Sequence, residues 1–230
     1  MSKTAWIIFV AVIVLIFGGL ITWSRLSNPA IDVSTIDTNA IIGANDQNGQ
    51  IADHTLGNTE STVVLVEYGD FQCPSCGGAH PQVKTVMEEY GDDVLFVFRN
   101  FPLTTIHPNA RAAAAAAEAA GLQNKYWEMH NLLFENQSAW SSLNGQDRTD
   151  VFIGYAESIG LDTDQFVTDM SAESVNQKIS FDQAISKELG LNSTPTFILN
   201  GEQLEDSVSS AIVQGDTTQL TTLLDELLDK

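Results

Sequence analysis

The amino-terminal end of the chain carries a long apolar run without charge. Residues 5–23 contain no Asp, Glu, Lys or Arg, and about 19 helical residues at 1.5 Å each span about 28 Å, close to the thickness of the hydrocarbon core of a bilayer. A buried core helix of this length would show a polar face. We therefore expect residues 1–26 to form one transmembrane helix. We interpret it as an uncleaved signal anchor rather than a removed signal peptide, because no convincing small-residue cleavage site follows the run.

The next segment has a different composition. Residues 27–50 are rich in Ser, Asn, Asp, Thr and Gly and show little hydrophobic periodicity, which is typical of a flexible linker. The remaining residues, 51–230, are numerous enough to bury one sizeable core. We therefore expect a tether over 27–50 followed by a single folded domain.

Two stretches of the domain have the continuous apolar, β-branched pattern of strands that are buried on both faces. They are residues 62–68 and 94–101. A helical stretch ending near Tyr90 separates them, which predicts a right-handed parallel βαβ unit with residues 62–68 at the centre of the sheet. Residues 53–58 are expected to add an edge strand. Parallel sheets place their sites at the carboxyl ends of the strands.

A helical pattern follows the second strand. Residues 109–120 are almost all alanine, the best helix former. Apolar side chains then recur every three or four positions over residues 126–136, 150–159 and 172–189. We expect these helices to form an insertion over about residues 105–189.

After the insertion, the pattern returns to that of a sheet. Residues 196–199 are expected to form a strand, and the dipeptide Asn200-Gly201 is typical of a hairpin turn. Residues 217–228 have the spacing of an amphipathic helix. The whole pattern predicts an α/β fold.

The only two cysteines, Cys73 and Cys76, stand where the central strand gives way to a helix. Pro74 suits the first helical turn, since its missing N–H would be unpaired there. A thiolate at this position meets free backbone N–H groups and the positive end of the helix dipole, so the pKa of Cys73 should fall from about 8.5 toward or below neutrality. We predict Cys73 as an exposed nucleophile and Cys76, one turn deeper on the same face, as the resolving thiol.

Two other interpretations compete for this pair. A structural disulfide between Cys73 and Cys76 would close too small a loop to remove much chain entropy. A metal site could draw on Cys73, Cys76 and His80, but structural zinc usually takes four ligands and the chain has no further cysteine. We therefore favour redox chemistry and predict no metal.

Glu67 is an acid inside the central strand. It alternates with Val63 and Leu65 and so points to the same side as core residues. Burial there would raise the pKa of its carboxyl group. The alternative is an edge position at which Glu67 is solvated.

The cysteine motif resembles the active site of thioredoxin-fold oxidoreductases. The resemblance rests on a strand, a short turn, Cys73-Pro74-Ser75-Cys76 and then Pro81, together with the distant segment 191–201. That segment is similar to the cis-proline loop of the fold, which implies that Pro195 is cis, faces the cysteines and, with Thr194, pairs with an extended substrate chain.

The helices between these two motifs resemble the insertion of the DsbA-like branch. Residues 107–111 and 125–130 look like those of its bacterial and archaeal members, and the likeness covers roughly residues 50–205. It implies a thioredoxin-like fold with an inserted helical domain, preceded here by one transmembrane helix. It also implies that Glu67 relays a proton to or from the resolving thiol. In the strongest oxidants of the family a histidine stands between the cysteines, whereas this chain has Ser75.

The function that this resemblance implies is disulfide formation in secreted or surface proteins. The catalytic domain is expected outside the cytoplasm, on a single-pass anchor in the cell membrane, with no cofactor besides the Cys73–Cys76 disulfide. Its partners would be reduced or misoxidised polypeptides and a quinone-linked membrane reoxidant of the DsbB or VKOR type. Two alternatives stay open: a disulfide reductase or isomerase of the same fold, and a non-catalytic module that binds peptides or a metal.

Charge narrows the range of partners. The chain has 30 Asp and Glu against 10 Lys and Arg, a formal net charge of −20. Such a surface repels polyanions, so we expect no nucleic acid partner. The excess of acid fits either a soluble, self-repelling surface or a high-salt habitat.

We assign no catalytic role to the four histidines, His54, His80, His107 and His130.

Overall fold

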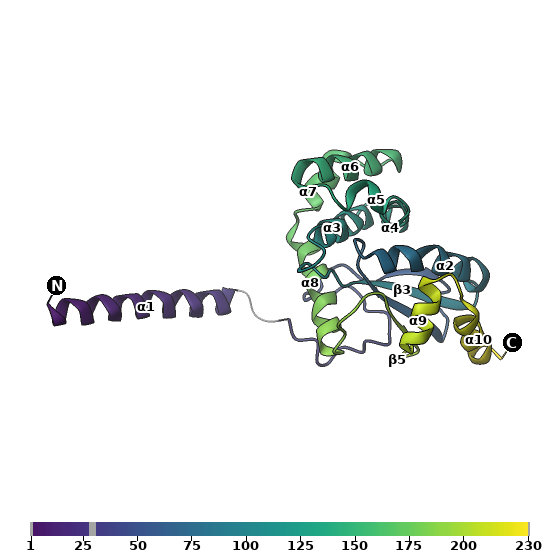
Figure 1. The fold of residues 1–230 in the computed structure, drawn as a ribbon, viewed down its shortest axis with the longest axis horizontal. Helices are drawn as coiled ribbons and strands as arrows, with labels where there is room; N and C mark the ends of the chain where they lie inside the picture. The colour runs from purple at the N-terminus through teal and green to yellow at the C-terminus, as the bar shows by residue number, and fades with distance from the viewer. Residues whose placement is uncertain (1, 28–30, 230) are drawn as a thin grey trace. The chain divides into compact units, whose positions relative to one another are not determined.

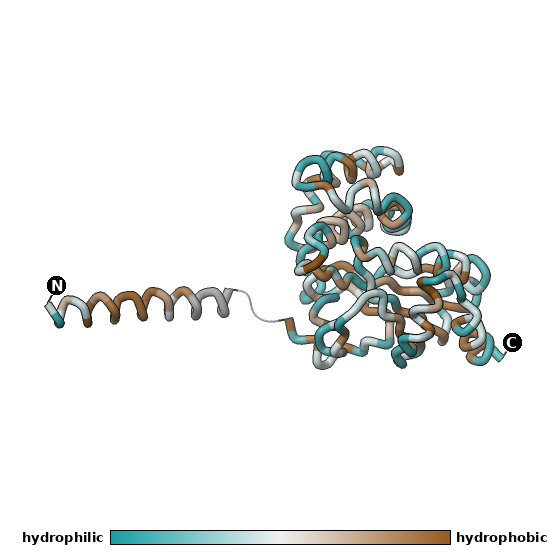
Figure 2. Tube along the Cα trace, in the orientation of Figure 1, coloured by the Kyte–Doolittle hydropathy of each residue, from teal (hydrophilic) through white to brown (hydrophobic). Residues whose placement is uncertain are grey.

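The computed structural model describes residues 2–27 and 31–229. The chain divides into two compact units, Met1–Asp32 and Val33–Lys230. In the first, helix α1 (Lys3–Ser27) contains an 18-residue stretch, Lys3–Leu20, that is long and apolar enough to cross a membrane. Large apolar side chains of this stretch, Leu15 and Phe17 among them, are exposed, and Figure 2 shows the hydrophobic run along the helix. Such a helix is consistent with membrane anchoring.

The second unit is an α/β domain (Figure 1). Its described strands are β1 (His54–Gly57), β2 (Val63–Gly69), β3 (Val94–Asn100), β4 (Thr196–Leu199) and β5 (Glu202–Gln203). Its described helices are α2 (Pro74–Tyr90), α3 (Ala110–Gly121), α4 (Tyr126–Glu135), α5 (Gln137–Trp140), α6 (Gly145–Ser158), α7 (Thr163–Asp169), α8 (Glu173–Glu188), α9 (Asp206–Val213) and α10 (Thr218–Leu227).

The five strands form one mixed sheet in the order β1-β3-β2-β4-β5. Strands β2 and β3 are parallel and connected through α2, which confirms the predicted βαβ unit with β2 at the centre. Strand β1 lies antiparallel to β3 at one edge, also as predicted. The expected hairpin joins β4 to β5, and Asn200 and Gly201 have φ values of 47° and 86°, a backbone region that this dipeptide adopts readily.

Helices α3 to α8 lie between β3 and β4 in the sequence. Figure 1 shows α3 to α7 gathered above the sheet, with α8 running back toward it. Alanine side chains of α3 are buried, so neighbouring helices can approach its backbone closely. Helix α6 begins at Gly145, five residues before the predicted start, and α7 is a separate helix that the sequence pattern does not predict. Polar residues in both helices weaken the periodic pattern.

The prediction of a flexible linker over residues 27–50 is wrong from Val33 onward. Val33 and Ile42 are buried in the domain, and the Arg99 side chain donates hydrogen bonds to backbone carbonyls in this segment. Isolated apolar residues separated by polar turns produce no periodic pattern, so the sequence could not distinguish this packed segment from a tether. Residues 28–30 lie outside the described residues.

Buried ion pairs connect Asp53, just after this segment, to strand β3 and to helix α8. The Asp53 carboxylate accepts from Arg99 Nη2 at 2.8 Å and from Lys178 Nζ at 3.0 Å, and Lys178 Nζ also lies 2.7 Å from Asp182. Burial would raise the pKa of Asp53, but the charges of Lys178 and Arg99 lower it to about 2. Each of these buried charges therefore has an opposite charge in direct contact.

Hydrogen bonds extend this network to β1 and α3. Asp182 accepts from the backbone N–H of Asn100 at 3.1 Å, and the Asn100 side chain donates to Glu118 at 2.6 Å. The second Glu118 oxygen lies 2.8 Å from His54 Nε2. Four segments of the domain, at residues 53–54, 99–100, 118 and 178–182, thus meet in one polar cluster.

We predict that Lys178→Met destabilises the chain by about 3 to 5 kcal/mol, because it leaves Asp53 and Asp182 buried without their shared cation. Urea unfolding followed by near-ultraviolet circular dichroism measures this change. The control is Lys84→Met, which removes an exposed pair with Glu135 at 3.0 Å and should cost no more than about 1 kcal/mol. Equal destabilisation by the two variants would contradict the role given to the buried network.

Candidate active site

The active-site segment is the junction between β2 and α2. Cys73 is the N-cap of α2 with extended backbone angles, φ −69° and ψ 122°, and Pro74 occupies the first helical position. The Cys73 carbonyl accepts the helical hydrogen bond from Gly77 N at 3.1 Å. The prediction that the helix begins at the cysteines is confirmed.

The two thiols occupy different environments. Both are free, Cys76 is completely buried, and Cys73 is 7% exposed. A hydrogen bond from the Cys76 thiol, together with the backbone N–H groups of Cys76 and Ser75, outweighs burial and lowers the pKa of Cys73 to about 5. Burial raises the pKa of Cys76 well above its ordinary value. The expected direction of the Cys73 shift is therefore confirmed.

The exposure predicted for Cys73 is wrong, and the proline loop is the reason. The Thr194–Pro195 peptide bond is cis, as the resemblance implied. The Cys73 sulfur lies 3.4 Å from the Thr194 carbonyl oxygen. This loop, which comes directly before β4, covers part of the sulfur. The sequence predicts that the proline loop faces the cysteines, but it does not predict how much of the Cys73 sulfur the loop covers.

A polar hollow of about 380 Å³ lies beside the proline loop. Its wall combines the helix start, the loop and α9, and the residues that line it are Ser75, Ser193, Thr194, Pro195, Asp206, Ser209, Ser210, Val213 and Gln214. A chain lying here would meet mostly hydroxyl and amide groups next to Cys73.

Glu67 lies on the central strand, between Phe98 of β3 and Phe197 of β4 in the register. It is 3% exposed, and its Oε1 atom has no hydrogen-bond partner among the described residues. Burial, and then the negative charge of Cys73, raise the pKa of its carboxyl group to about 8. The core-facing prediction is confirmed, and the solvated edge position is wrong.

Asp70 holds the turn that precedes the cysteines. One of its carboxylate oxygens accepts from Gln72 N at 2.7 Å, and the other accepts from Leu103 N at 2.8 Å and lies 2.7 Å from His107 Nδ1. The Asp70 backbone N–H lies 3.5 Å from Cys76 Sγ. His107 therefore supports the turn, a structural task that its sequence position did not reveal.

Gln137 is a residue of the site that sequence reasoning missed. From α5 it donates to the backbone carbonyls of Phe71 at 2.8 Å and Cys73 at 2.9 Å. A Cβ atom on Gly77 would come within 3.0 Å of the Gln137 amide. The available signal was Gly77 itself, since a glycine in the first turn of a helix costs about 1 kcal/mol relative to alanine and indicates a close neighbour.

Cys73, Cys76 and His80 do not form a group that could hold a metal ion in the part of the chain that the structure describes.

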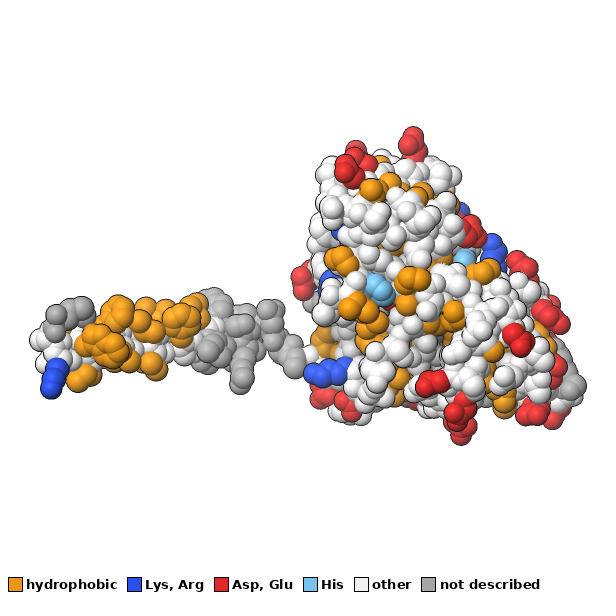
Figure 3. All heavy atoms as spheres, in the orientation of Figure 1, with side chains coloured by type: hydrophobic (Ala, Val, Ile, Leu, Met, Phe, Trp, Pro, Cys, Tyr) orange, Lys and Arg blue, Asp and Glu red, His pale blue; other side chains and the backbone are white. Residues whose placement is uncertain are grey.

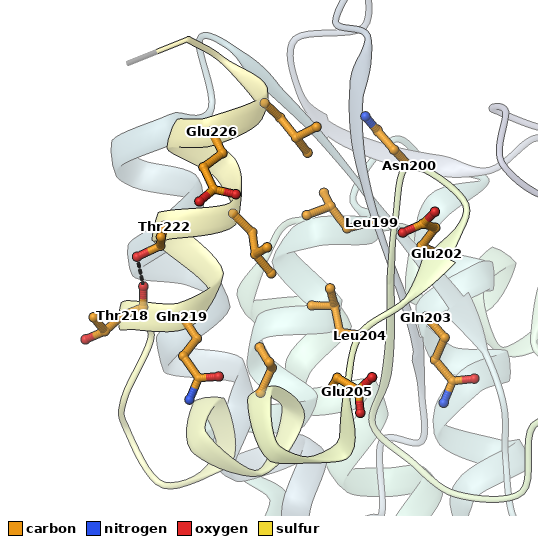
Figure 4. Close-up of a pocket in the computed structure, with 13 residues that line it drawn as sticks. Leu199, Asn200, Glu202, Gln203, Leu204, Glu205, Thr218, Gln219, Thr222 and Glu226 are labelled. Carbon is orange, nitrogen blue, oxygen red and sulfur yellow. Dashed lines mark hydrogen bonds between the residues drawn. The ribbon is translucent and has the colours of Figure 1, made fainter.

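A larger hollow, of about 930 Å³, lies between the β4–β5 hairpin and helices α9 and α10. Figure 4 shows Leu199 and Leu204 in its wall and Glu202, Glu205 and Glu226 around it. It contains neither cysteine nor residues of the proline loop.

Comparison with known proteins gives matches of two kinds. A family model described as thioredoxin matches residues 50–215. Curated relatives include the Na(+)/H(+) antiporter NhaA 1 of Mycolicibacterium vanbaalenii, 40% identical over 153 residues, which are 65% of this chain and 23% of that protein. The antiporter NhaA of Herminiimonas arsenicoxydans is 32% identical over 161 residues, 70% of this chain and 24% of that protein. The chain thus spans about a quarter of the length of the curated relatives it matches.

Solved structures share the fold. A thioredoxin-like oxidoreductase from Silicibacter pomeroyi DSS-3 is 29% identical, with a TM-score of 0.62, over 80% of this chain and 95% of that one. Oxidised BdbD from Bacillus subtilis is 21% identical, with a TM-score of 0.59, over 76% and 99% of the two chains. Alpha-DsbA1 from Wolbachia pipientis is 21% identical, with a TM-score of 0.58, over 75% and 94%. The thioredoxin-like fold with inserted helices is confirmed.

We predict that Cys76→Ala raises the pKa of Cys73 by at least about one unit, because the largest contribution that lowers it, the hydrogen bond from the Cys76 thiol, is lost. The rate of alkylation by iodoacetamide, measured from about pH 3 to about pH 9, gives the midpoint in each protein. In the unchanged chain the midpoint should lie at about 5. Identical midpoints in the two proteins would contradict the assignment.

The folded chain favours the neutral form of the Glu67 carboxyl group, and this preference stabilises the fold. The contribution is complete below the pKa of the unfolded chain, about 4.5, and is lost as the pH rises through the pKa of the folded chain, about 8. Glu67→Gln removes this loss. The variant should therefore gain stability relative to the unchanged chain between about pH 4.5 and about pH 8, by on the order of 1 kcal/mol for each unit of the pKa shift. Urea unfolding at the two pH values measures it, with the exposed Glu202→Gln as control. A constant difference would contradict the buried-acid assignment.

Proposed function

We propose, because this chain belongs to the thioredoxin family, that it is a thiol-disulfide oxidoreductase that forms disulfides in polypeptides. The observation that carries the proposal is the contrast between the two thiols. Cys73 has a pKa of about 5 and lies at the helix start, whereas the pKa of the buried Cys76 is raised. A cysteine pair of this kind has a stable thiolate at one position only, which is what disulfide exchange at one defined sulfur requires.

The proposed reaction starts from the Cys73–Cys76 disulfide. A substrate thiolate attacks Cys73 Sγ, the bond between the two enzyme sulfurs breaks, and Cys76 leaves with the electron pair. The Cys76 thiolate is disfavoured by burial, so it takes up a proton. Glu67 is suited to supply that proton, since its pKa of about 8 keeps it largely protonated near neutral pH.

The second step releases the product. Another thiolate of the same substrate attacks the substrate sulfur in the mixed disulfide, and Cys73 leaves as a thiolate. The hydrogen bonds that lower its pKa make it a good leaving group. The substrate has then lost two electrons and gained a disulfide, and the enzyme holds a dithiol. The same stabilisation of the reduced form favours disulfide formation over the alternatives, reduction and isomerisation.

Substrate contacts are assigned to the proline loop. Thr194 and Pro195 lie beside Cys73 and line the polar hollow with Ser75. An extended chain placed there would present a sulfur to Cys73 while pairing with backbone groups of the loop. We assign the substrate-binding role to Thr194 and Pro195. Pro74 and Ser75 are the two residues between the cysteines of the active-site motif. A peptide-binding module without catalysis would use the same surface but not the thiols.

The cellular setting is part of the proposal. Helix α1 would anchor the chain as a single-pass protein of the cell membrane with the catalytic domain on the extracytoplasmic side, where disulfides persist. Reduced or misoxidised polypeptides are then the substrates. A quinone-linked membrane protein of the DsbB or VKOR type would return the dithiol to the disulfide. Acidic side chains are spread over the visible face of the domain (Figure 3), which disfavours nucleic acid as a partner.

The test is oxidation of a reduced two-cysteine model peptide by the oxidised full-length chain, followed by mass spectrometry. We expect stoichiometric disulfide formation by the unchanged chain and a reaction slower by about a hundredfold or more with Cys73→Ala, which has no disulfide to transfer. Cys76→Ala, mixed with the peptide in its disulfide form, should trap a mixed disulfide, because its Cys73 thiolate displaces one peptide thiolate and no second thiol of the chain resolves the bond. Equilibration with glutathione buffers should give a reduction potential between about −120 and −180 mV, whereas about −270 mV would indicate a reductase. Unchanged peptide oxidation by Cys73→Ala would overturn the proposal.

A further inference from the structure

The polar hollow beside the proline loop has a lining that bears on which substrates it accepts. Of the nine residues that line it, six carry a hydroxyl or an amide group, and only Pro195 and Val213 are apolar. An apolar substrate side chain placed there would bury little apolar surface, and so would gain little from the hydrophobic effect. The lining therefore favours polar neighbours of the reacting cysteine.

One residue of the lining is charged. Asp206, the first residue of α9, is exposed and lines the hollow. The ion pairs among the described residues do not include Asp206. From the opposite wall, Ser75 contributes a neutral side chain, and its backbone N–H already donates to Cys73. A substrate chain in the hollow thus meets one carboxylate and no positively charged side chain.

The segment that builds most of the hollow adds to this negative charge. Residues 190–229 include the proline loop, the β4–β5 hairpin and helices α9 and α10, and they contain no Lys, Arg or His. Acids recur in this segment from Glu202 to Asp229, and Glu205, directly before Asp206, is also exposed. The Lys and Arg residues of the domain that the structure describes all lie between Lys84 and Lys187. The charge of Asp206 therefore has no compensating base within its own part of the chain.

We propose, on the basis of the function proposed above, that this hollow selects polypeptides that carry Lys or Arg next to the reacting cysteine. The cationic group of that side chain pairs with the Asp206 carboxylate while the cysteine reaches Cys73. Attraction between opposite charges accelerates encounter and orients the chain, whereas an acidic neighbour is repelled. A neutral polar neighbour gives an intermediate rate.

The test uses four reduced two-cysteine peptides. In three of them each cysteine is flanked on both sides by Lys, Gln or Glu. The fourth has Gln flanks and carries the same number of Lys residues at its ends. Each is mixed with the oxidised full-length chain in nanodiscs of zwitterionic lipid at about 20 mM salt, and mass spectrometry follows disulfide formation. Each rate is divided by that of the same peptide with hydroxyethyl disulfide, a neutral reagent, because flanking charges also change the reactivity of the peptide thiol.

We expect the Lys-flanked peptide to be oxidised faster than the Glu-flanked peptide by about fivefold or more, because one pair attracts and the other repels. It should also exceed the peptide with terminal Lys residues by about twofold or more, which separates a local contact from attraction to the acidic chain as a whole. About 0.5 M salt should reduce the first ratio to less than about twofold, since it screens exposed charges.

Matched variants assign the preference to the hollow. Asp206→Asn should reduce the ratio of the Lys-flanked to the Glu-flanked rate by about half or more. Glu157→Gln makes the same change in net charge at an exposed position of α6 that is not part of the hollow, and should leave the ratio unchanged.

The Gln-flanked peptide separates this inference from the proposed function. If that peptide is oxidised but the Lys-flanked and Glu-flanked peptides react at equal rates, the inference is overturned and the proposed function stands. Equal rates for the two Lys-containing peptides, or the same ratio in Asp206→Asn and Glu157→Gln, would also overturn it. Oxidation of none of the four peptides would overturn the proposed function and this inference with it.

Discussion

The first turn of α2 gives two sulfur atoms three residues apart opposite preferences for a proton, and the chemistry of the domain depends on that difference. Cys73 meets the free N–H groups of the helix start and the thiol below it, whereas Cys76 meets apolar side chains. Neither environment would suffice alone. If both thiols had the same hydrogen bonds and the same burial, neither sulfur would be preferred as the thiolate. The hydrogen bond from the Cys76 thiol to Cys73 and the complete burial of Cys76 contribute most to the contrast.

The rest of the domain holds this turn in place from several directions. The central position of β2 fixes where the turn begins, and Asp70 and Gln137 fix its path through hydrogen bonds from elements that are distant in the sequence. Elsewhere in the domain, the network around Asp53 and Lys178 joins the segment that begins at Val33 to β3 and α8. The site therefore depends on contacts between segments that are far apart in the sequence.

The sequence predicted the parts of this arrangement that local patterns determine. The apolar run of β2, Pro74 at the helix start and the unusual acid at Glu67 each carry their signal within a few residues. The hydrogen bonds of Gln137 and the pairing of Asp70 with His107 join a side chain to partners at least 33 residues away, and polar residues in helices and turns do not show which partner they have. The packed segment beginning at Val33 was missed because single buried residues among polar turns resemble a linker.

The hydrogen bonds of Gln137 have a consequence for the modular description of this fold. An insertion is usually pictured as an addition that leaves the parent core intact. Here a side chain from the inserted helices occupies the space left by Gly77 and binds the carbonyls on both sides of the reactive turn. A shortened core without the insertion would lose the donor to the Phe71 carbonyl and leave the Cys73 carbonyl with only its helical hydrogen bond from Gly77, next to a weak helical turn. At this turn, the core and the insertion therefore act as one structural unit.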